Sequence, residues 1–150
     1  MANSWMTIFL NSLDVYKQLC QSVCDDAGIL QGELNVLLFL ANNPDKNTAM
    51  DIYKHAGMKQ SILSTRIEKM VKEGYLVREP IPGDRRKIKL VCTEKAEPVI
   101  RIGRETQKRF MELLTDGIPK DDLSVCARVM KLMEQNLFEC REKALKGELK

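Results

Sequence analysis

The sequence predicts a mainly α-helical fold with one small β-hairpin, built as a single domain over residues 1–150. Three observations support this prediction. Apolar residues recur three or four positions apart over most of the chain, which is the spacing of one face of a helix. Residues 87–92 instead alternate basic and apolar side chains, as a half-buried strand does. Glycine, proline and asparagine separate these segments, so short turns are expected to join the elements.

The turns divide the chain into six helices and two strands. Helices are expected over residues 4–25, 31–42, 48–55, 59–73 and 94–114, and from residue 121 or 122 onward. Strands are expected over residues 75–79 and 87–92, around a turn at residues 81–85. Thr48 and Thr93 are expected to cap the helices that follow them. Pro98 lies in the first turn of the long fifth helix, which it is expected to kink.

The composition is that of a globular protein, with 44% hydrophobic and 30% charged residues. No apolar stretch reaches the 18 residues of a membrane span, and the N-terminus lacks the features of a secretory signal. The five cysteines are odd in number and lack CxxC spacing, which favours a reducing compartment and a cytoplasmic location. With one histidine in the chain, no metal and no cofactor are expected.

Basic residues are concentrated in the middle of the chain. The net charge is only +3, but residues 54–89 contain ten basic and four acidic side chains. This segment is therefore positive and its flanks are negative. Such a distribution favours an anion-binding face, although a solvated charged surface would have the same composition.

The third and fourth helices, joined at Gly57, follow the plan of a helix-turn-helix. Leu63, Ile67 and Met70 share one face of the fourth helix and are expected to lie in the core. Polar and basic side chains cover the other faces and could reach base edges or phosphates in a major groove. These candidate DNA-binding residues are Lys59, Gln60, Ser61, Ser64, Thr65, Arg66 and Lys69. The alternative is an ordinary amphipathic surface helix.

The hairpin that follows favours DNA binding, because its tip carries three consecutive cations. Residues 82–88 would form a wing, in which Arg85, Arg86 and Lys87 could enter the adjacent minor groove. Asp84 is expected to accept hydrogen bonds from Arg86 or from the loop backbone and so to hold the cation in place. The alternative is a solvated charged turn. The elements together predict a winged helix-turn-helix over about residues 31–96.

Residues 83–96, which contain the Asp-x-Arg run and the Thr93-Glu94-Lys95 sequence, closely resemble the wing and the following helix start of the MarR family of transcription regulators. Residues 61–76 resemble the recognition helix of that family and its exit. Ala96 stands where the family commonly has glycine, and Arg66 where it usually has an apolar residue. The resemblance implies a homodimeric DNA-binding protein that recognises a pseudo-palindromic operator in double-stranded DNA. It also implies a repressor that a small ligand or oxidation releases.

The outer helices carry more apolar side chains than a thin domain can bury. Trp5, Ile8 and Phe9 near one end, and Val129, Met133 and Leu137 near the other, would leave an exposed patch on a monomer. We therefore expect residues 4–25 and 97–145 to form dimerisation helices. The alternative for each single residue is the core of its own chain.

The resemblance also implies a small effector, an aromatic or phenolic anion, bound between the dimerisation helices and the DNA-binding lobe. Candidate lining residues are Tyr16, Met50, Tyr53 and Met70, although residues on helix faces are usually core. Cys20 and Cys24 lie four apart on one helix face and are candidates for a redox switch. Buried, reduced cysteines are the alternative, and the sensor position of the family, near Met6, holds no cysteine. Metal sensing through His55 is a weaker alternative.

Two other classes of function compete with DNA binding as interpretations of this sequence. A winged helix can serve as a protein-interaction module without binding DNA, but such a module would carry apolar residues where the wing has cations. An enzyme would need a catalytic motif, and the sequence has no GxSxG, P-loop or HExxH. The sequence therefore predicts a DNA-binding transcription regulator with no enzymatic activity.

Overall fold

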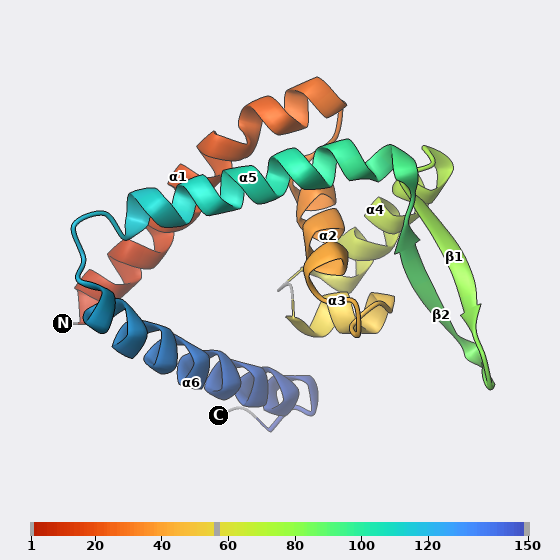
Figure 1. Ribbon diagram of the computed structural model, residues 1–150. Coiled ribbons are helices and arrows are strands. Elements are labelled where there is room, and N and C mark those ends of the chain that lie inside the picture. Colours follow the sequence, from red (N-terminus) through yellow and green to blue (C-terminus); the bar gives the residue numbers. More distant parts are fainter. Residues whose placement is uncertain (1, 56–57, 149–150) are drawn as a thin grey trace.

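A computed structural model describes residues 2–55 and 58–148, without the side chains of residues 2, 3, 85 and 86. Within these ranges the chain forms six α-helices, a 3-10 turn and a two-stranded hairpin (Figure 1). The helices are α1 (Ala2–Ala27), α2 (Gln31–Asn42), α3 (Ala49–His55), α4 (Gln60–Lys72), α5 (Glu97–Leu114) and α6 (Lys120–Leu145). The strands are β1 (Leu76–Ile81) and β2 (Asp84–Cys92). The mainly α fold with a hairpin wing is confirmed.

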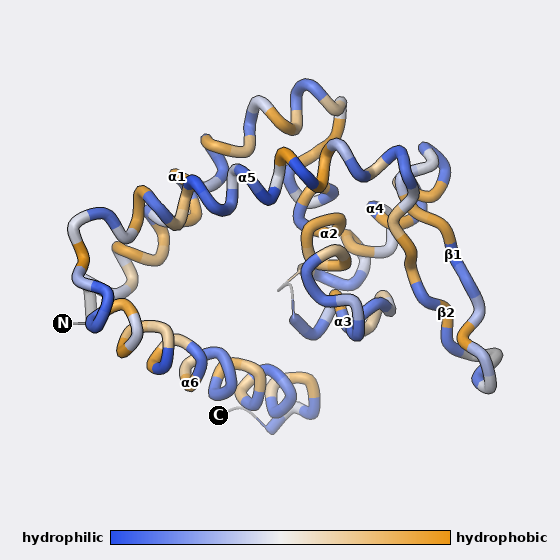
Figure 2. The backbone as a smooth tube through the Cα atoms, in the orientation of Figure 1, coloured by the Kyte–Doolittle hydropathy of each residue, from blue (hydrophilic) through white to orange (hydrophobic). Residues whose placement is uncertain are grey.

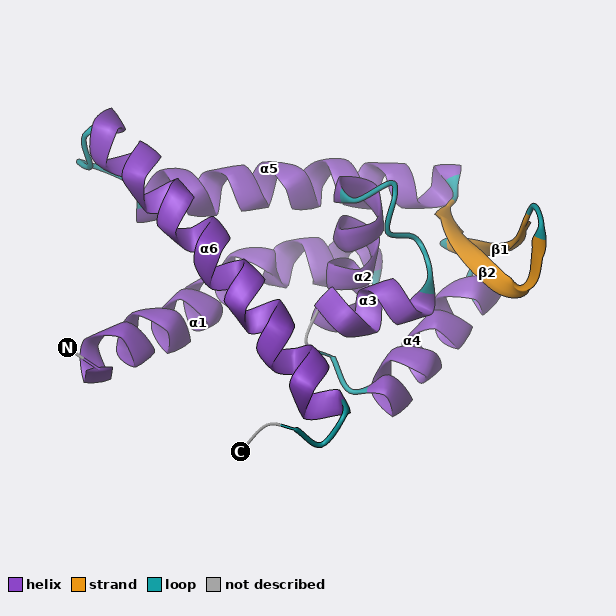
Figure 3. Cartoon of the chain, turned by 90° about the horizontal axis from the view of Figure 1, so that it is seen from below, coloured by secondary structure: helices purple, strands orange, loops and turns teal. Residues whose placement is uncertain are grey.

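The elements form a lobe and a long helical arm. Helices α2, α3 and α4 pack beside the hairpin, while α1 and α5 run side by side away from this lobe (Figure 1). After the turn that follows α5, α6 runs back toward α3 (Figure 3). No helix in the described ranges combines the length and the apolar character that crossing a bilayer requires.

The hydrophobic core lies in the lobe and is centred on α2. Five apolar residues of this 12-residue helix are buried, because its apolar run meets neighbours on several sides. Leu63, Ile67 and Met70 of α4 complete the core, as predicted. Helix α5 approaches α2 closely at Gly103, where an added Cβ would lie 3.0 Å from a methyl carbon of Leu38.

Among the described elements, α3 is the one with which helix α6 makes substantial contact. Helix α6 has no buried residue. The imidazole of His55 stacks on the Phe138 ring, with 5.0 Å between the ring centroids. Beside it, Lys54 Nζ lies 3.1 Å from Glu142 Oε1. A ring stack and an ion pair thus join the last helix to the third.

The first helix of the helix-turn-helix begins with the predicted cap. The hydroxyl oxygen of Thr48 accepts a hydrogen bond from the Asp51 backbone N–H at 3.2 Å, and the Asp51 carboxylate accepts one from the Thr48 N–H at 2.9 Å. These reciprocal bonds satisfy two backbone donors at the helix start. The turn predicted at Gly57 lies outside the described residues.

The wing has a tighter turn than predicted. Pro82 and Gly83 alone connect the strands, and Gly83 has a φ of +85°, which favours glycine. Ile81 therefore pairs with Asp84, and both strands are longer than expected. The ladder runs regularly from the Leu76–Cys92 pair to the Pro80–Ile88 pair and then shifts, so residues 85–87 have no partner on β1.

The start of the long fifth helix also differs from the prediction. Residues Glu94–Ala96 form a 3-10 turn, and α5 begins at Glu97. Thr93 does not cap it: its hydroxyl donates to the Gly74 carbonyl oxygen at 2.6 Å. The first turn of α5 contains Pro98, where the missing N–H costs nothing because the helix has no acceptor for it there. The proline thus fixes where the helix starts.

Candidate nucleic-acid interface

Helix α4, the predicted recognition helix, presents a polar outer face. Gln60, Ser61, Ser64 and Thr65 are exposed, opposite the buried apolar face. Two of the hydroxyls are bonded within the helix: Ser64 Oγ donates to the Gln60 carbonyl oxygen at 3.0 Å, and Thr65 Oγ1 to that of Ser61 at 3.1 Å. The hydrogen of each hydroxyl is thereby used within the helix, while the oxygen keeps lone pairs that can accept. The two hydroxyls can therefore accept hydrogen bonds, for example from the amino groups of adenine or cytosine.

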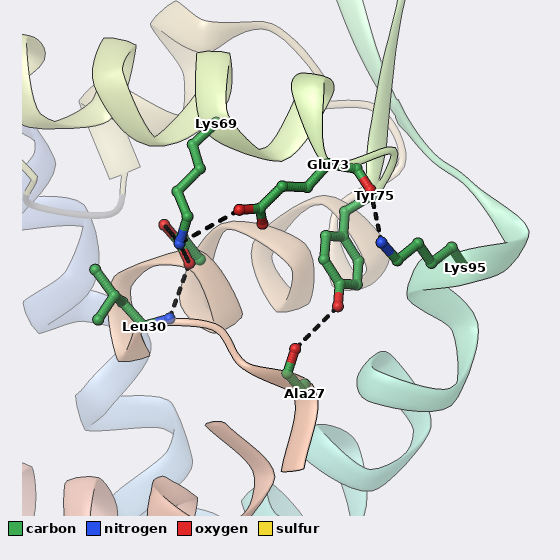
Figure 4. A network of polar contacts seen from close by, with 7 residues as sticks. Ala27, Leu30, Lys69, Glu73, Tyr75 and Lys95 are labelled. Atoms are coloured by element: carbon green, nitrogen blue, oxygen red, sulfur yellow. Dashed lines mark hydrogen bonds and ion pairs between the residues drawn. The ribbon is translucent and has the colours of Figure 1, made fainter. Parts of the chain in front are cut away.

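Lys69, a candidate phosphate contact, forms an ion pair inside the lobe. Its Nζ lies 3.0 Å from each carboxylate oxygen of Glu33, which is only 1% exposed, and 3.9 Å from Glu73 (Figure 4). Glu33 also accepts a hydrogen bond from the Leu30 N–H at 2.8 Å and so closes the N-terminus of α2. Lys69 balances this buried charge, and its contact with DNA stays a prediction.

Arg66 leans against α2. A Cβ added at Gly32 would lie 2.7 Å from its guanidinium carbon, so glycine at this position makes room for the arginine. Its Nε and Nη1 are buried and have no hydrogen-bond partner in the described part of the chain. Arg66 therefore does not present these two nitrogens to a ligand outside, as a phosphate contact through them would require.

The hairpin is tied to the recognition helix by an ion pair. Arg78 of β1 donates to both carboxylate oxygens of Glu68 on α4, at 2.6 and 3.3 Å. Along the hairpin, Lys89 Nζ lies 2.7 Å from Glu79 Oε2. These contacts hold the wing at a set angle to α4.

At the tip of the wing, Asp84 Oδ2 lies 3.4 Å from the ammonium nitrogen of Lys87, which is exposed. The aspartate therefore pairs with a wing cation, whereas the prediction named Arg86 or the loop backbone as its partner. The side chains of Arg85 and Arg86 lie outside the described residues, so the contact between Asp84 and Arg86 stays a prediction. Residues 85–87 are also the part of β2 that has no strand-ladder partner on β1.

A second network of contacts joins the end of α4 to the end of α1 and to the turn before α5. Tyr75 donates through its hydroxyl to the Ala27 carbonyl oxygen at 3.0 Å, at the end of α1 (Figure 4). Lys95 Nζ lies 4.4 Å from the centre of the Tyr75 ring and donates to the Glu73 carbonyl oxygen at 2.6 Å. A cation at the carboxyl end of a helix is also favoured by the helix dipole.

The four candidate effector residues do not come together. Tyr16 lines an open pocket of about 610 Å³, with the Phe110 ring 5.3 Å away. Met50 is exposed, Met70 is buried in the core, and the Tyr53 ring lies 5.1 Å from the guanidinium carbon of Arg141. Sequence reasoning missed the other lining residues, which are Asn35, Leu38, Phe39, Asn42, Asn43, Gln107, Phe110 and Met111. A usable signal was the seven-residue spacing of Asn35 and Asn42, which places two amides on one face of a largely apolar helix.

Cys20 and Cys24 both belong to the core, with 0% and 6% of their surfaces exposed. Cys24 Sγ lies 3.8 Å from Gln31 Oε1. Burial raises the pKa of the Cys24 thiol, and the nearby Cys20 adds to the rise. A protonated, buried thiol reacts slowly with oxidants, and a redox role for this pair stays a prediction. Among the described residues, no cluster of three or more histidine, cysteine or acidic side chains could hold a metal ion.

The predicted dimerisation face is apolar and exposed. Trp5, Phe9 and Leu137 each have more than half of their surface exposed, and Ile8, Val129 and Met133 are also open to solvent. Apolar segments recur along α1 and α6 (Figure 2). Exposed apolar patches of this kind usually mark interfaces.

Comparisons with known proteins agree with this architecture. Residues 27–87, which include α2 to α4 and most of the wing, match the MarR family. A MarR family regulator from Listeria monocytogenes, solved with a 26-mer DNA, superimposes with a TM-score of 0.84 at 11% identity, covering 100% of this chain and 97% of that one. A MarR protein from Peptoclostridium difficile gives 0.79 at 18% identity, covering 95% and 92%. A MarR regulator from Methanosarcina mazei gives 0.76 at 17% identity, covering 91% and 98%. The segment that carries the helix-turn-helix thus matches the MarR family model, and the whole chain has the fold of these solved MarR structures.

Proposed function

We propose that this protein is a transcription regulator that binds a pseudo-palindromic operator in double-stranded DNA. Helix α4 lies in the major groove and residues 82–88 enter the minor groove. The observation that carries the proposal is the Arg78–Glu68 ion pair, which fixes a basic wing beside the polar face of α4. The Listeria regulator, which shares this fold, was solved with DNA.

The proposed active species is a homodimer. Helix α6 has 26 residues and none of them is buried within its own chain. Its apolar residues and those at the start of α1 would be covered by the same helices of a second copy. A two-fold axis would then present two recognition helices to successive turns of one DNA face.

The proposed signal is a small ligand that acts on the pocket between α1, α2 and α5. This pocket joins the helical arm to the lobe, so a ligand there contacts both parts. A ligand that fits one orientation of the lobe better than the other shifts the equilibrium between them. We propose that occupancy releases the operator, which makes the protein a repressor. Release by oxidation would first require Cys20 or Cys24 to become accessible.

Fluorescence anisotropy with the DNA upstream of the protein's own gene tests this function. We expect binding that weakens steeply with salt, because lysine and arginine displace counterions from phosphates. Arg86→Ala is expected to weaken binding by roughly tenfold. The matched control is Arg101→Ala on α5, whose guanidinium pairs with Glu105 away from the wing. Absence of binding to any upstream fragment at low salt would contradict the proposal and favour an interaction module.

A further inference from the structure

The pocket between α1, α2 and α5 has an unusual wall for a site that would take an organic anion. None of its nine lining residues carries a formal charge. Tyr16, Phe39 and Phe110 supply aromatic rings, while the polar groups are four side-chain amides and the Tyr16 hydroxyl. A ring-shaped ligand therefore finds apolar and aromatic surface on several sides, but no cation to balance a negative charge.

A cation beside this wall already has hydrogen-bond partners in the chain. Arg104 of α5 donates through Nε to Asn42 Oδ1 at 2.9 Å, and its Nη2 donates to the Ala41 carbonyl oxygen. Arg104 thereby caps the C-terminus of α2, where free carbonyls attract a cation. His55 stacks on Phe39, and burial and Lys46 lower the pKa of its imidazole, which favours the neutral form.

The amide groups form a wall with a preferred hydrogen-bond direction. Asn42 receives the Arg104 bond and donates through Nδ2 to Gln107 Oε1 at 3.1 Å. Asn35 Oδ1 accepts from Gln31 at 3.0 Å. The carbonyls of Asn35, Asn42 and Gln107 thus each accept one bond from another side chain. The amide N–H groups of Asn35, and the Gln107 N–H that does not bond Tyr16, remain as donors for a ligand.

The pKa of Tyr16 shows how the pocket affects the ionisation of an aromatic hydroxyl. Burial, followed by a hydrogen bond with Cys20, raises the pKa of Tyr16 above its ordinary value of 10.0, although a hydrogen bond from Gln107 opposes the rise. The pocket therefore disfavours a phenolate in its own wall. A ligand phenolate in the same place would meet the same desolvation.

We propose that this pocket binds an uncharged aromatic compound with hydrogen-bond-accepting groups, such as an aromatic amide or ketone, in preference to an aromatic carboxylate or phenolate. Only the regulatory role of such a ligand rests on the proposed function, because binding itself can be measured without DNA. It retains the aromatic ring of the effector expected from the sequence and rejects the anion.

Matched pairs of compounds test the ligand class. The full chain is titrated calorimetrically at neutral pH with 2-naphthamide and 2-naphthoate, and with quinoline-3-carboxamide and its carboxylate. Each pair shares a ring system and differs in charge. We expect each amide to bind at least roughly tenfold more tightly than its carboxylate. Tighter or equal binding of the carboxylates, or no binding by any of the four at millimolar concentration, would overturn the inference.

Substitutions in the wall show whether binding occurs there. Gln107→Leu removes a donor and should weaken naphthamide binding, whereas Thr106→Ala on the same helix should not, because that hydroxyl donates to the Ile102 carbonyl oxygen. Met111→Lys places a cation at the exposed rim and should turn the preference toward naphthoate; Met111→Gln, its neutral control, should not. An unchanged preference in Met111→Lys would place the binding elsewhere and overturn the inference.

A parallel anisotropy titration with the upstream DNA separates the two proposals. If the protein binds DNA but prefers carboxylates, only the ligand class is wrong. If it binds amides at this wall but never binds DNA, the pocket stands and the regulatory function fails.

Discussion

Lys69 of the recognition helix and Glu33 of α2 share a bidentate contact, with the lysine nitrogen 3.0 Å from both carboxylate oxygens. The lysine is 38% exposed and the glutamate 1%. The same carboxylate binds the Leu30 N–H. One buried acid therefore sets both the start of α2 and the placement of α4 against it.

Removing the lysine should cost more than a surface ion pair does. In Lys69→Met, the Glu33 carboxylate stays buried without its cation, so we expect the free energy of unfolding to fall by about 1–3 kcal/mol in a urea titration. Adding Glu33→Gln should recover part of this loss, because the amide oxygen can still accept from Leu30. Lys108→Met, which breaks an exposed pair with Glu112, should change stability by less than about 0.5 kcal/mol. A loss no larger than in this control would contradict the role of Lys69.

Arg66 leads to the opposite expectation. Its two buried nitrogens without partners cost free energy, so Arg66→Met should raise the free energy of unfolding by about 1–2 kcal/mol. Because these nitrogens face α2, the salt dependence of operator binding should stay unchanged. Both quantities follow from urea unfolding and anisotropy on one preparation. A lower stability together with a shallower salt dependence would show that Arg66 binds phosphate after all.

The stability of the fold should fall in alkali. Tyr16 has a folded-state pKa raised above the ordinary 10.0, and Cys24 one raised above 9.0, so the unfolded chain loses these protons first. Their stabilising effect is complete below about pH 9 and is lost as the pH rises, with a slope of up to about 1.4 kcal/mol per pH unit for each group.

Thermal unfolding between pH 8 and pH 11 measures this effect by comparison with a variant, since other groups also titrate. Tyr16→Phe should show a shallower decline than the natural chain above pH 10. Ser12→Ala on the same helix, whose hydroxyl is bonded to the Ile8 carbonyl oxygen, is the control. Equal slopes in the natural chain and Tyr16→Phe would show that the phenol is not protected.

The sequence predicts those features that local contacts determine, and it misses those that depend on residues far apart in the chain. Helix α2 has the predicted bounds, since its apolar run ends at an asparagine-proline turn, and the core face of α4 follows from spacing alone. The role of Glu33 depends on Lys69, 36 residues away, and no local pattern reveals it. The pocket likewise needs α1, α2 and α5 to meet. Thr93 resembles a cap locally, but the Gly74 carbonyl oxygen competes for its hydroxyl.

The exposed apolar face of α1 and α6 should become buried in a dimer in solution. Analytical ultracentrifugation is expected to show a dimer for the natural chain, and Trp5→Asp or Met133→Asp should raise its dissociation constant by roughly 30-fold or more. Both side chains are exposed in the single chain, at 61% and 40%, so neither change should unfold it. Lys131→Asp on the same helix is a charged control at a polar position. A natural chain that stays monomeric at micromolar concentration would refute the dimer.

The pairing of the hairpin has a consequence for the divergence of regulators built on this plan. At the turn, Ile81 pairs with Asp84, and the next three residues, 85–87, have no partner on β1. From the Pro80–Ile88 pair to the Leu76–Cys92 pair the register is regular. Mutations in those three residues therefore alter neither the strand ladder nor the core beneath it. Under the proposed function, selection can change what the tip recognises without disturbing the strand ladder, so new operator preferences can arise there by single substitutions.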